Sequence, residues 1–156
     1  MRKLICLIAF SLMIGTTTLQ AQDSYDTAIG LGLDFGEGST FVGPSVKHFF
    51  DSNNAGLAEV TFANDVTSLT ALYQYNDAFP NAGGLKWFAG AGFSIAFFDG
   101  GSDFFLRPTA GLDFKISNVP LSITFDWRPA IFLGDANGGD TFEPARFGLG
   151  FRYCLN

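Results

Sequence analysis

The sequence predicts an all-β fold, an eight-stranded antiparallel up-and-down transmembrane β-barrel. Apolar and polar residues alternate with a period of two through eight segments, and no stretch has the periodicity of a helix. Glycine, aspartate, asparagine, serine and proline separate these segments, as expected for turns. Several segments exceed the roughly five or six residues usual for globular strands. They match the roughly nine to eleven residues that cross a bilayer at a tilt.

The N-terminal residues have the pattern of a secretory signal peptide. Arg2 and Lys3 precede the apolar run 4–14, and Ala21 supplies a small residue before a cleavage site. We therefore expect residues 1–21 to be a signal peptide and residues 22–156 to form the barrel. A membrane anchor is the alternative, but the apolar run is short for a spanning helix.

Charge and cysteine content exclude several classes of function. Removing Arg2 and Lys3 changes the formal net charge from −6 to −8, and so acidic a chain lacks the cations that bind nucleic-acid phosphates. Cys154 is the only cysteine after the signal peptide, which excludes an internal disulfide and a cysteine-based metal site. No glycine-rich phosphate loop or paired-carboxylate motif is present, so we expect no cofactor.

The expected strands have two faces of different chemistry. They cover approximately residues 25–35, 40–50, 57–65, 69–77, 85–98, 104–117, 120–133 and 141–155. In the seventh, Leu121, Phe125 and Trp127 share one face, whereas Asp126 and Arg128 lie on the other. The second face is rich in glycine and carries every Lys and Arg that follows the signal peptide: Lys47, Lys86, Arg107, Lys115, Arg128, Arg146 and Arg152.

This division of the faces favours a membrane barrel. The interior of a small barrel needs small residues for room and paired charges for a polar lumen, while its apolar exterior contacts lipid. A soluble sandwich or lipocalin is the alternative, and it has the reverse arrangement. A soluble chain with one face this apolar would expose a larger patch than monomers tolerate.

Hairpin registers predict an ion network in the lumen. With a turn at residues 117–120, the numbers of two paired residues sum to 237, and with a loop at residues 134–140 they sum to 274. In both registers, inward-facing residues pair only with inward-facing residues. Since unpaired charges are costly away from water, we expect Asp126 near Arg146 and near Arg152 or Lys115. The predicted network comprises Asp126, Arg128, Arg146, Arg152, Lys115, Asp113 and Arg107, and Glu59 is a further ion-pair partner.

Prolines predict a gap in the strand ladder. Pro108 and Pro129 face each other in the register that sums to 237, and proline donates no ladder hydrogen bond. One interpretation is a feature that flares the barrel rim. The other is a lateral opening through which a lipid tail or small apolar ligand reaches the lumen.

Four segments carry a resemblance to a known family: "WFAGAGFSI" (87–95), "RPTAGLDFKI" (107–116), "VPLSITFDWRP" (119–129) and "RFGLGFRY" (146–153). They resemble the eight-stranded outer-membrane barrels of Gram-negative bacteria typified by OmpA and OmpX, and most of all the small Bacteroidetes-type barrels. The resemblance implies location in the cell outer membrane, with both termini periplasmic. It also implies two partners, the outer-membrane lipids with lipopolysaccharide and the barrel insertion machinery. The chain departs from the pattern at Tyr153-Cys154-Leu155-Asn156, where such barrels often end on an aromatic residue.

That layout places the connections 36–39, 64–68, 99–103 and 134–140 outside the cell. They and their flanks carry an acidic rim of Glu37, Asp65, Asp99, Asp103, Asp135, Asp140 and Glu143. Solvation of the loops is one reading of these carboxylates. The sharper hypothesis is capture of divalent metal ions that bridge to lipopolysaccharide phosphates, because calcium and magnesium prefer oxygen ligands.

The expected function is a structural or interaction role at the cell surface. Eight strands enclose only enough space for side chains, and Phe88, Phe105 and Phe132 lie on the inner face, so we expect a plugged polar lumen. The alternatives are a narrow porin or small-ligand transporter and a lipid-modifying enzyme. The single histidine, His48, lies on the lipid face with Ser45 on the opposite one, which argues against a serine–histidine pair on one strand but leaves a partner on another strand open. We expect no enzymatic activity. A monomer is favoured.

Overall fold

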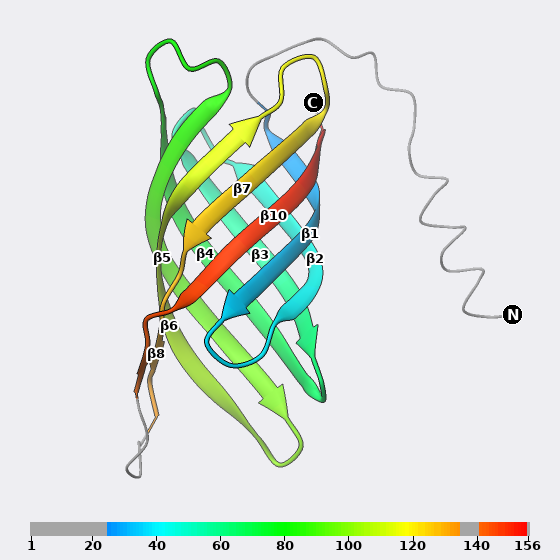
Figure 1. Cartoon of the computed structure of the whole chain (residues 1–156), viewed down its shortest axis with the longest axis vertical. Helices are drawn as coiled ribbons and strands as arrows, with labels where there is room; N and C mark the ends of the chain where they lie inside the picture. Colours follow the sequence, from blue (N-terminus) through cyan, green and yellow to red (C-terminus); the bar gives the residue numbers. More distant parts are fainter. Residues whose placement is uncertain (1–24, 135–140, 156) are drawn as a thin grey trace, which may run out of the picture.

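The computed structural model describes residues 25–134 and 141–155, which form one closed antiparallel β-barrel (Figure 1). Eight long strands follow one another around the wall in the order β5-β4-β3-β2-β1-β10-β7-β6, and pairing of β5 with β6 closes the sheet. The long strands are β1 (Thr27–Gly36), β2 (Phe41–Phe49), β3 (Asn54–Ala63), β4 (Val66–Ala78), β5 (Leu85–Phe98), β6 (Gly101–Lys115), β7 (Leu121–Trp127) and β10 (Arg146–Leu155). The short strands β8 (Ala130–Phe132) and β9 (Phe142–Glu143) prolong β7 and β10 toward the loops. The all-β, eight-stranded antiparallel fold class is confirmed.

The two ends of the barrel carry different parts of the chain. The terminal end carries Tyr25 and Leu155, and the loop end carries the β1–β2, β3–β4 and β5–β6 connections (Figure 1). The expected signal peptide lies outside the described residues, as do Asp135 and Asp140 of the acidic rim. No helix within the described ranges is long and apolar enough to span a membrane.

Both expected hairpin registers are confirmed in the body of the barrel. Gly111 pairs with Asp126, which sums to 237, and Trp127 pairs with Phe147, which sums to 274. Beyond β7, Phe105 still pairs with Phe132 in the first register. Ala130 pairs with Glu143, however, so the second register changes to 273 near the loop end. One extra residue in the last strand therefore forms a bulge.

The prediction of continuous strands over residues 120–133 and 141–155 is wrong near the loop end. Each is interrupted, at Arg128–Pro129 and at Pro144–Ala145 respectively. The prolines lack the N–H that a continuous ladder needs, and the bulge shifts the chain by one residue. The indole Nε1 of Trp127 donates to the carbonyl of Pro144 at 2.6 Å, which joins the two strands across the interruption. Elsewhere β3 begins earlier than expected, at Asn54, and β6 at Gly101.

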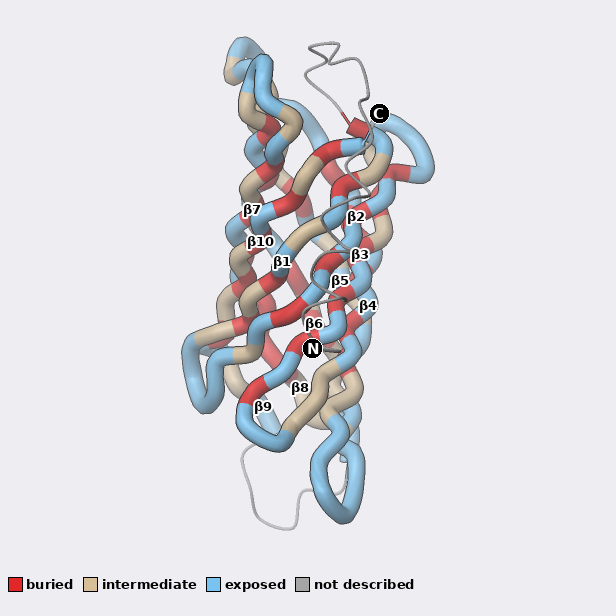
Figure 2. Tube along the Cα trace, turned by 90° about the vertical axis from the view of Figure 1, so that its right-hand side faces the viewer, coloured by how far each residue is buried: buried red, intermediate tan, exposed pale blue. Residues whose placement is uncertain are grey.

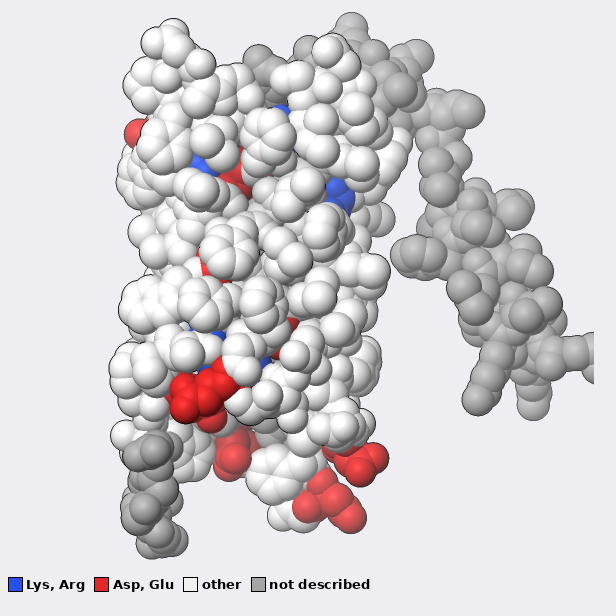
Figure 3. All heavy atoms as spheres, in the orientation of Figure 1, with Lys and Arg blue, Asp and Glu red and all other residues white. Residues whose placement is uncertain are grey.

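The wall separates the two faces as the sequence predicts. Buried and exposed residues alternate along the strands (Figure 2), and in β7 Ser122, Thr124 and Asp126 are buried between outward-facing neighbours. Large apolar side chains cover the exterior, among them Leu31, Phe62, Phe93, Phe125 and Phe151. Figure 3 shows this surface largely free of charged atoms between the two ends, with carboxylates gathered at the loop end.

Candidate functional site

The polar interior of the barrel is the candidate functional site, and its charges lie in three layers along the axis. The layer at the terminal end is centred on Asp113 of β6. Lys47 of β2 donates to its Oδ2 at 2.8 Å, Tyr25 to the same oxygen at 2.6 Å, and Ser122 to its Oδ1 at 2.7 Å. Lys47 also donates to Asn76 at 2.8 Å, so the ammonium group has two hydrogen-bond acceptors although it is buried.

The middle layer is built on the guanidinium of Arg128, whose side chain is only 1% exposed. Its Nε and Nη2 donate to the two carboxylate oxygens of Asp126 at 2.6 and 2.8 Å. Its Nη1 donates to Glu59 Oε2 at 2.5 Å. Asp126 and Arg128 are two residues apart and face the same way, so this bidentate contact is local, whereas the contact with Glu59 comes from a distant strand.

Arg152 completes the middle layer. Its Nη2 donates to Glu59 Oε1 at 3.0 Å, and its remaining donors reach Ser45 and Thr124, each at 2.8 Å. Thr109 donates to Asp126 at 2.9 Å. The layer therefore holds two guanidinium groups and two carboxylates, and the hydrogen bonds leave neither charge type in excess.

Glycines make room for these large side chains. A Cβ atom added at Gly148 would lie 2.2 Å from the guanidinium of Arg128, and one at Gly150 would lie 2.3 Å from Nη1 of Arg152. A Cβ atom at Gly32 would meet the Glu59 carboxylate at 2.3 Å. At these three glycines a charged group occupies the space that a side chain would need.

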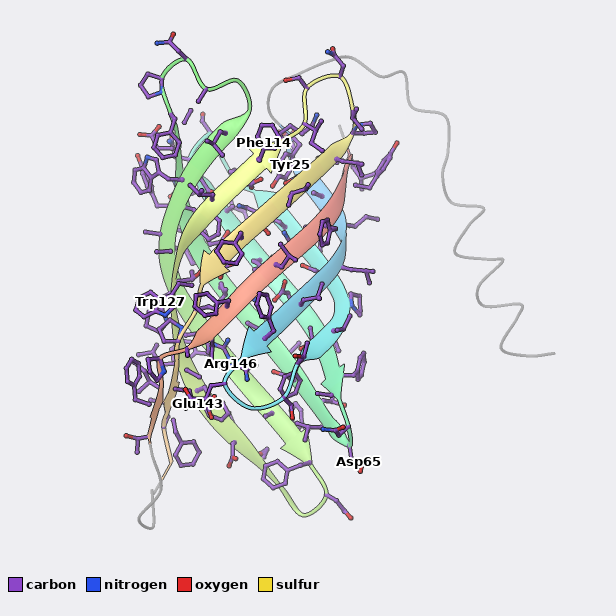
Figure 4. All side chains as sticks on the ribbon, in the orientation of Figure 1. Tyr25, Asp65, Phe114, Trp127, Glu143 and Arg146 are labelled. Atoms are coloured by element: carbon purple, nitrogen blue, oxygen red, sulfur yellow. The ribbon has the colours of Figure 1, made fainter. Side chains whose placement is uncertain are left out.

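The layer at the loop end has a different composition. Asp34 of β1 accepts hydrogen bonds from Nε and Nη2 of Arg146 at 3.0 and 2.6 Å, and from Nη2 of Arg107. The Nη1 of Arg146 donates to the carbonyls of Glu37 and Ser39 in the β1–β2 loop. Figure 4 shows Arg146 and Glu143 near this end of the barrel, far from Tyr25.

Two expected members of the network have other partners. Arg146 bonds Asp34 rather than Asp126, because its backbone pairs with Gly36 and Asp34 lies two residues further along that strand. Lys115, the last residue of β6, donates to the carbonyls of Ile116 and Val119 in the following turn. The expected contact of Asp126 with Arg146 is therefore wrong. Of the two alternatives Arg152 and Lys115, it is Arg152 that lies in the layer of Asp126. The prediction did not include Asp34 and Lys47, although both lie on the inner face of their strands.

The solved structures that match this chain include the following two. The N-terminal β-barrel domain of OprF from Pseudomonas aeruginosa matches with a TM-score of 0.58 at 16% sequence identity, covering 86% of this chain and 100% of that one. Neisserial surface protein A, NspA, matches with a TM-score of 0.54 at 15% identity, covering 88% and 100%. No protein-family model and no curated protein sequence matches the chain. The chain has the eight-stranded barrel fold that the resemblance to OmpA and OmpX implied.

The predicted proline gap coincides with an interruption in the ladder. Pairing of β6 with β7 ends at Ala110 and Trp127, and pairing with β8 resumes at Leu106 and Ile131. Pro108 and Pro129 lie between these points. The side chain of Pro129 is fully buried, so other residues pack over this part of the gap.

Five of the seven acidic rim residues belong to the described part of the chain, and they lie at the loop end. Glu37, Asp65 and Asp99 are exposed in or beside the hairpin connections, and Asp103 and Glu143 are half-buried at the loop end. Within residues 25–134 and 141–155, no three carboxylate, histidine or cysteine side chains come close enough to hold a metal ion. Divalent-ion capture by this rim stays a prediction.

His48 lies on the outer surface near the terminal end. Its Nδ1 is 2.8 Å from the Thr27 hydroxyl, and its ring packs edge-on against Phe50 at 5.4 Å between centroids. Ser45 faces the lumen instead, where it bonds Glu59. No carboxylate of the described residues hydrogen-bonds to His48, so the ring lacks the orienting third group of a catalytic triad.

Proposed function

We propose that the protein is a plugged outer-membrane barrel with a structural or interaction role at the cell surface rather than a porin. The observation that carries this proposal is the pair Arg128–Glu59. Glu59 lies on β3 and Arg128 follows β7, and these strands are four positions apart around an eight-stranded wall. The pair therefore crosses the full width of the lumen.

A second pair repeats this geometry at another depth. Lys47 on β2 and Asp113 on β6 are also four strands apart, and their charged atoms are 2.8 Å from each other. An ion or solute that moved along the axis would have to separate both pairs. Breaking a buried ion pair costs about 3–5 kcal/mol, which supports a closed lumen.

The exterior supports location in a membrane. A continuous apolar surface of this size is a site of lipid or protein contact, because monomeric soluble proteins rarely expose one. With the signal peptide expected from residues 1–21, the outer membrane is the compartment that accommodates such a barrel. Its lipids and lipopolysaccharide are then the nearest partners.

Conductance in planar lipid bilayers tests the plug. The full barrel, refolded and inserted, should give no stepwise current above the lipid background. The double variant Glu59→Ser, Arg128→Ser removes the pair across the lumen and should increase ion leakage, while Asp99→Ser at the loop end should not. Folding of each variant is checked by its heat-dependent shift on gels. Porin-like conductance of the wild-type protein would contradict the proposal.

A further inference from the structure

The three charged layers differ in their balance of charge. The middle layer pairs two guanidinium groups with two carboxylates, and Lys47 pairs with Asp113 in the layer at the terminal end. In the layer at the loop end, Asp34 alone serves both Arg107 and Arg146. Among the described residues, no other carboxylate forms an ion pair with either arginine, although Glu37 and Glu143 lie close by.

This layer lines a cavity at the loop end. The cavity has a volume of about 210 Å³, and its wall includes Asp34, Ser94, Arg107 and Arg146. Since a water molecule occupies about 30 Å³ of liquid, the space holds the equivalent of about seven waters. Phe41, Ala96, Phe105 and Ala130 supply apolar surface in the same wall, so the cavity combines cations with an apolar lining.

Two polar atoms in the wall have no hydrogen-bond partner. Three buried side-chain atoms of the described residues lack one, namely Gln74 Oε1, Ser94 Oγ and Arg107 Nε. The last two belong to this cavity, and both residues are at least nine-tenths buried. Buried polar atoms are nearly always satisfied, so a cavity that contains two such exceptions is a candidate ligand site.

The two arginines play different roles. Arg146 is held by Asp34 and by the loop carbonyls of Glu37 and Ser39, and its guanidinium lies 5.5 Å from the Phe41 ring centroid. The only hydrogen bond of the Arg107 side chain among the described residues is from Nη2 to Asp34. Arg107 thus keeps donors for a ligand, whereas Arg146 fixes the loop and Asp34.

We propose that this cavity binds a small organic carboxylate with an apolar body. The carboxylate accepts hydrogen bonds from Arg107 and Ser94, and the body rests against Phe105 and Phe41. The free donors of Arg107 hold the carboxylate, rather than any excess of positive charge in the wall. A dianion such as phosphate is disfavoured, because Glu37 and Glu143 also line the cavity and would repel the second negative charge.

Benzoate is a probe of suitable size, and benzamide is its uncharged isostere. Each is titrated into the folded protein in detergent micelles, and binding is followed by the backbone amide shifts of Ser94, Phe105 and Arg107. Benzoate should shift these amides saturably. Benzamide should bind at least about tenfold more weakly, because it forms no charge-assisted hydrogen bonds with the guanidinium.

Matched variants separate this site from general charge effects. Arg107→Gln should weaken benzoate binding by about tenfold or more, while Asp34 keeps both of its bonds to Arg146 and the barrel stays folded. Ser94→Ala tests the second contact and should weaken binding severalfold. Lys86→Gln removes the same charge at the opposite end and should leave binding unchanged. Lys86 is half-buried near the Ser52 carbonyl, outside the cavity.

Three results would overturn the assignment. Equal affinity for benzoate and benzamide would show partition into apolar surface. Unchanged benzoate binding in folded Arg107→Gln or Ser94→Ala would show that the named contacts are not used. Binding of inorganic phosphate as tight as that of benzoate would show a general oxyanion site. None of these results depends on whether the lumen conducts ions, so this proposal and that of a plugged barrel fail separately.

Discussion

At the scale of single residues, the run Asp126-Trp127-Arg128 shows how one strand serves two environments. Trp127 faces outward, while Asp126 and Arg128 face inward and bond each other. The pattern of period two was enough to predict these directions. It was not enough to predict that Arg128 also reaches Glu59, because partners across a barrel depend on its diameter and stagger rather than on distance along the chain.

Gly148 offers a test of the ion network at this scale. In Gly148→Ala the new methyl group would overlap the Arg128 guanidinium, which is locked by Asp126 and Glu59. We expect a loss of about 3 kcal/mol of unfolding free energy, as for a broken buried ion pair. Urea unfolding in lipid vesicles measures it.

Two companion variants make that result specific. Gly83→Ala lies in the β4–β5 loop, where an added Cβ has no atom within 4 Å, and should change stability by less than about 0.5 kcal/mol. In an Arg128→Met background, Gly148→Ala should cost much less than it does alone, since the locked guanidinium is gone. Additive effects of the two substitutions would contradict the clash.

At the scale of strands and hairpins, turn positions and proline chemistry predicted most of the arrangement. The registers that sum to 237 and 274 hold through β6, β7 and β10. The shift to 273 between β8 and β9 was not predicted, because alternation of polar and apolar residues carries no signal for a single extra residue beside prolines. Pro129, which lies in the same interruption, is fully buried.

The interrupted ladder predicts fast hydrogen exchange near the loop end. The backbone amides that border the gap, those of Leu106, Ala110 and Ile131, should exchange faster than those of Phe114 and Ile123, which lie within continuous pairing. In the double variant Pro108→Val, Pro129→Val the restored N–H groups can rejoin the strands, so exchange of the bordering amides should slow. Exchange of these amides in the wild-type protein as slow as at the barrel centre would show that the interruption does not loosen the wall.

At the scale of the whole molecule, the exterior makes a prediction that separates a membrane barrel from a soluble one. Leu31 lies midway along β1 and is 54% exposed, between the outward-facing Pro44 and Phe151 on the neighbouring strands. Leu155 is also exposed but lies at the terminal end. Both positions face outward, and they differ mainly in depth along the barrel.

Depth decides the cost of a charge on a lipid-facing wall. Arginine costs about 2–4 kcal/mol at the bilayer midplane and about 0–1 kcal/mol near the interfaces. Leu31→Arg should therefore destabilise the barrel in lipid vesicles by about 2–4 kcal/mol, and Leu155→Arg by about 1 kcal/mol or less. On a soluble barrel both would be ordinary surface substitutions within about 0.5 kcal/mol of wild type. Equal, small effects of the two variants on urea unfolding would therefore place the wall in water and contradict the proposed membrane location, even if the folded barrel itself were unchanged.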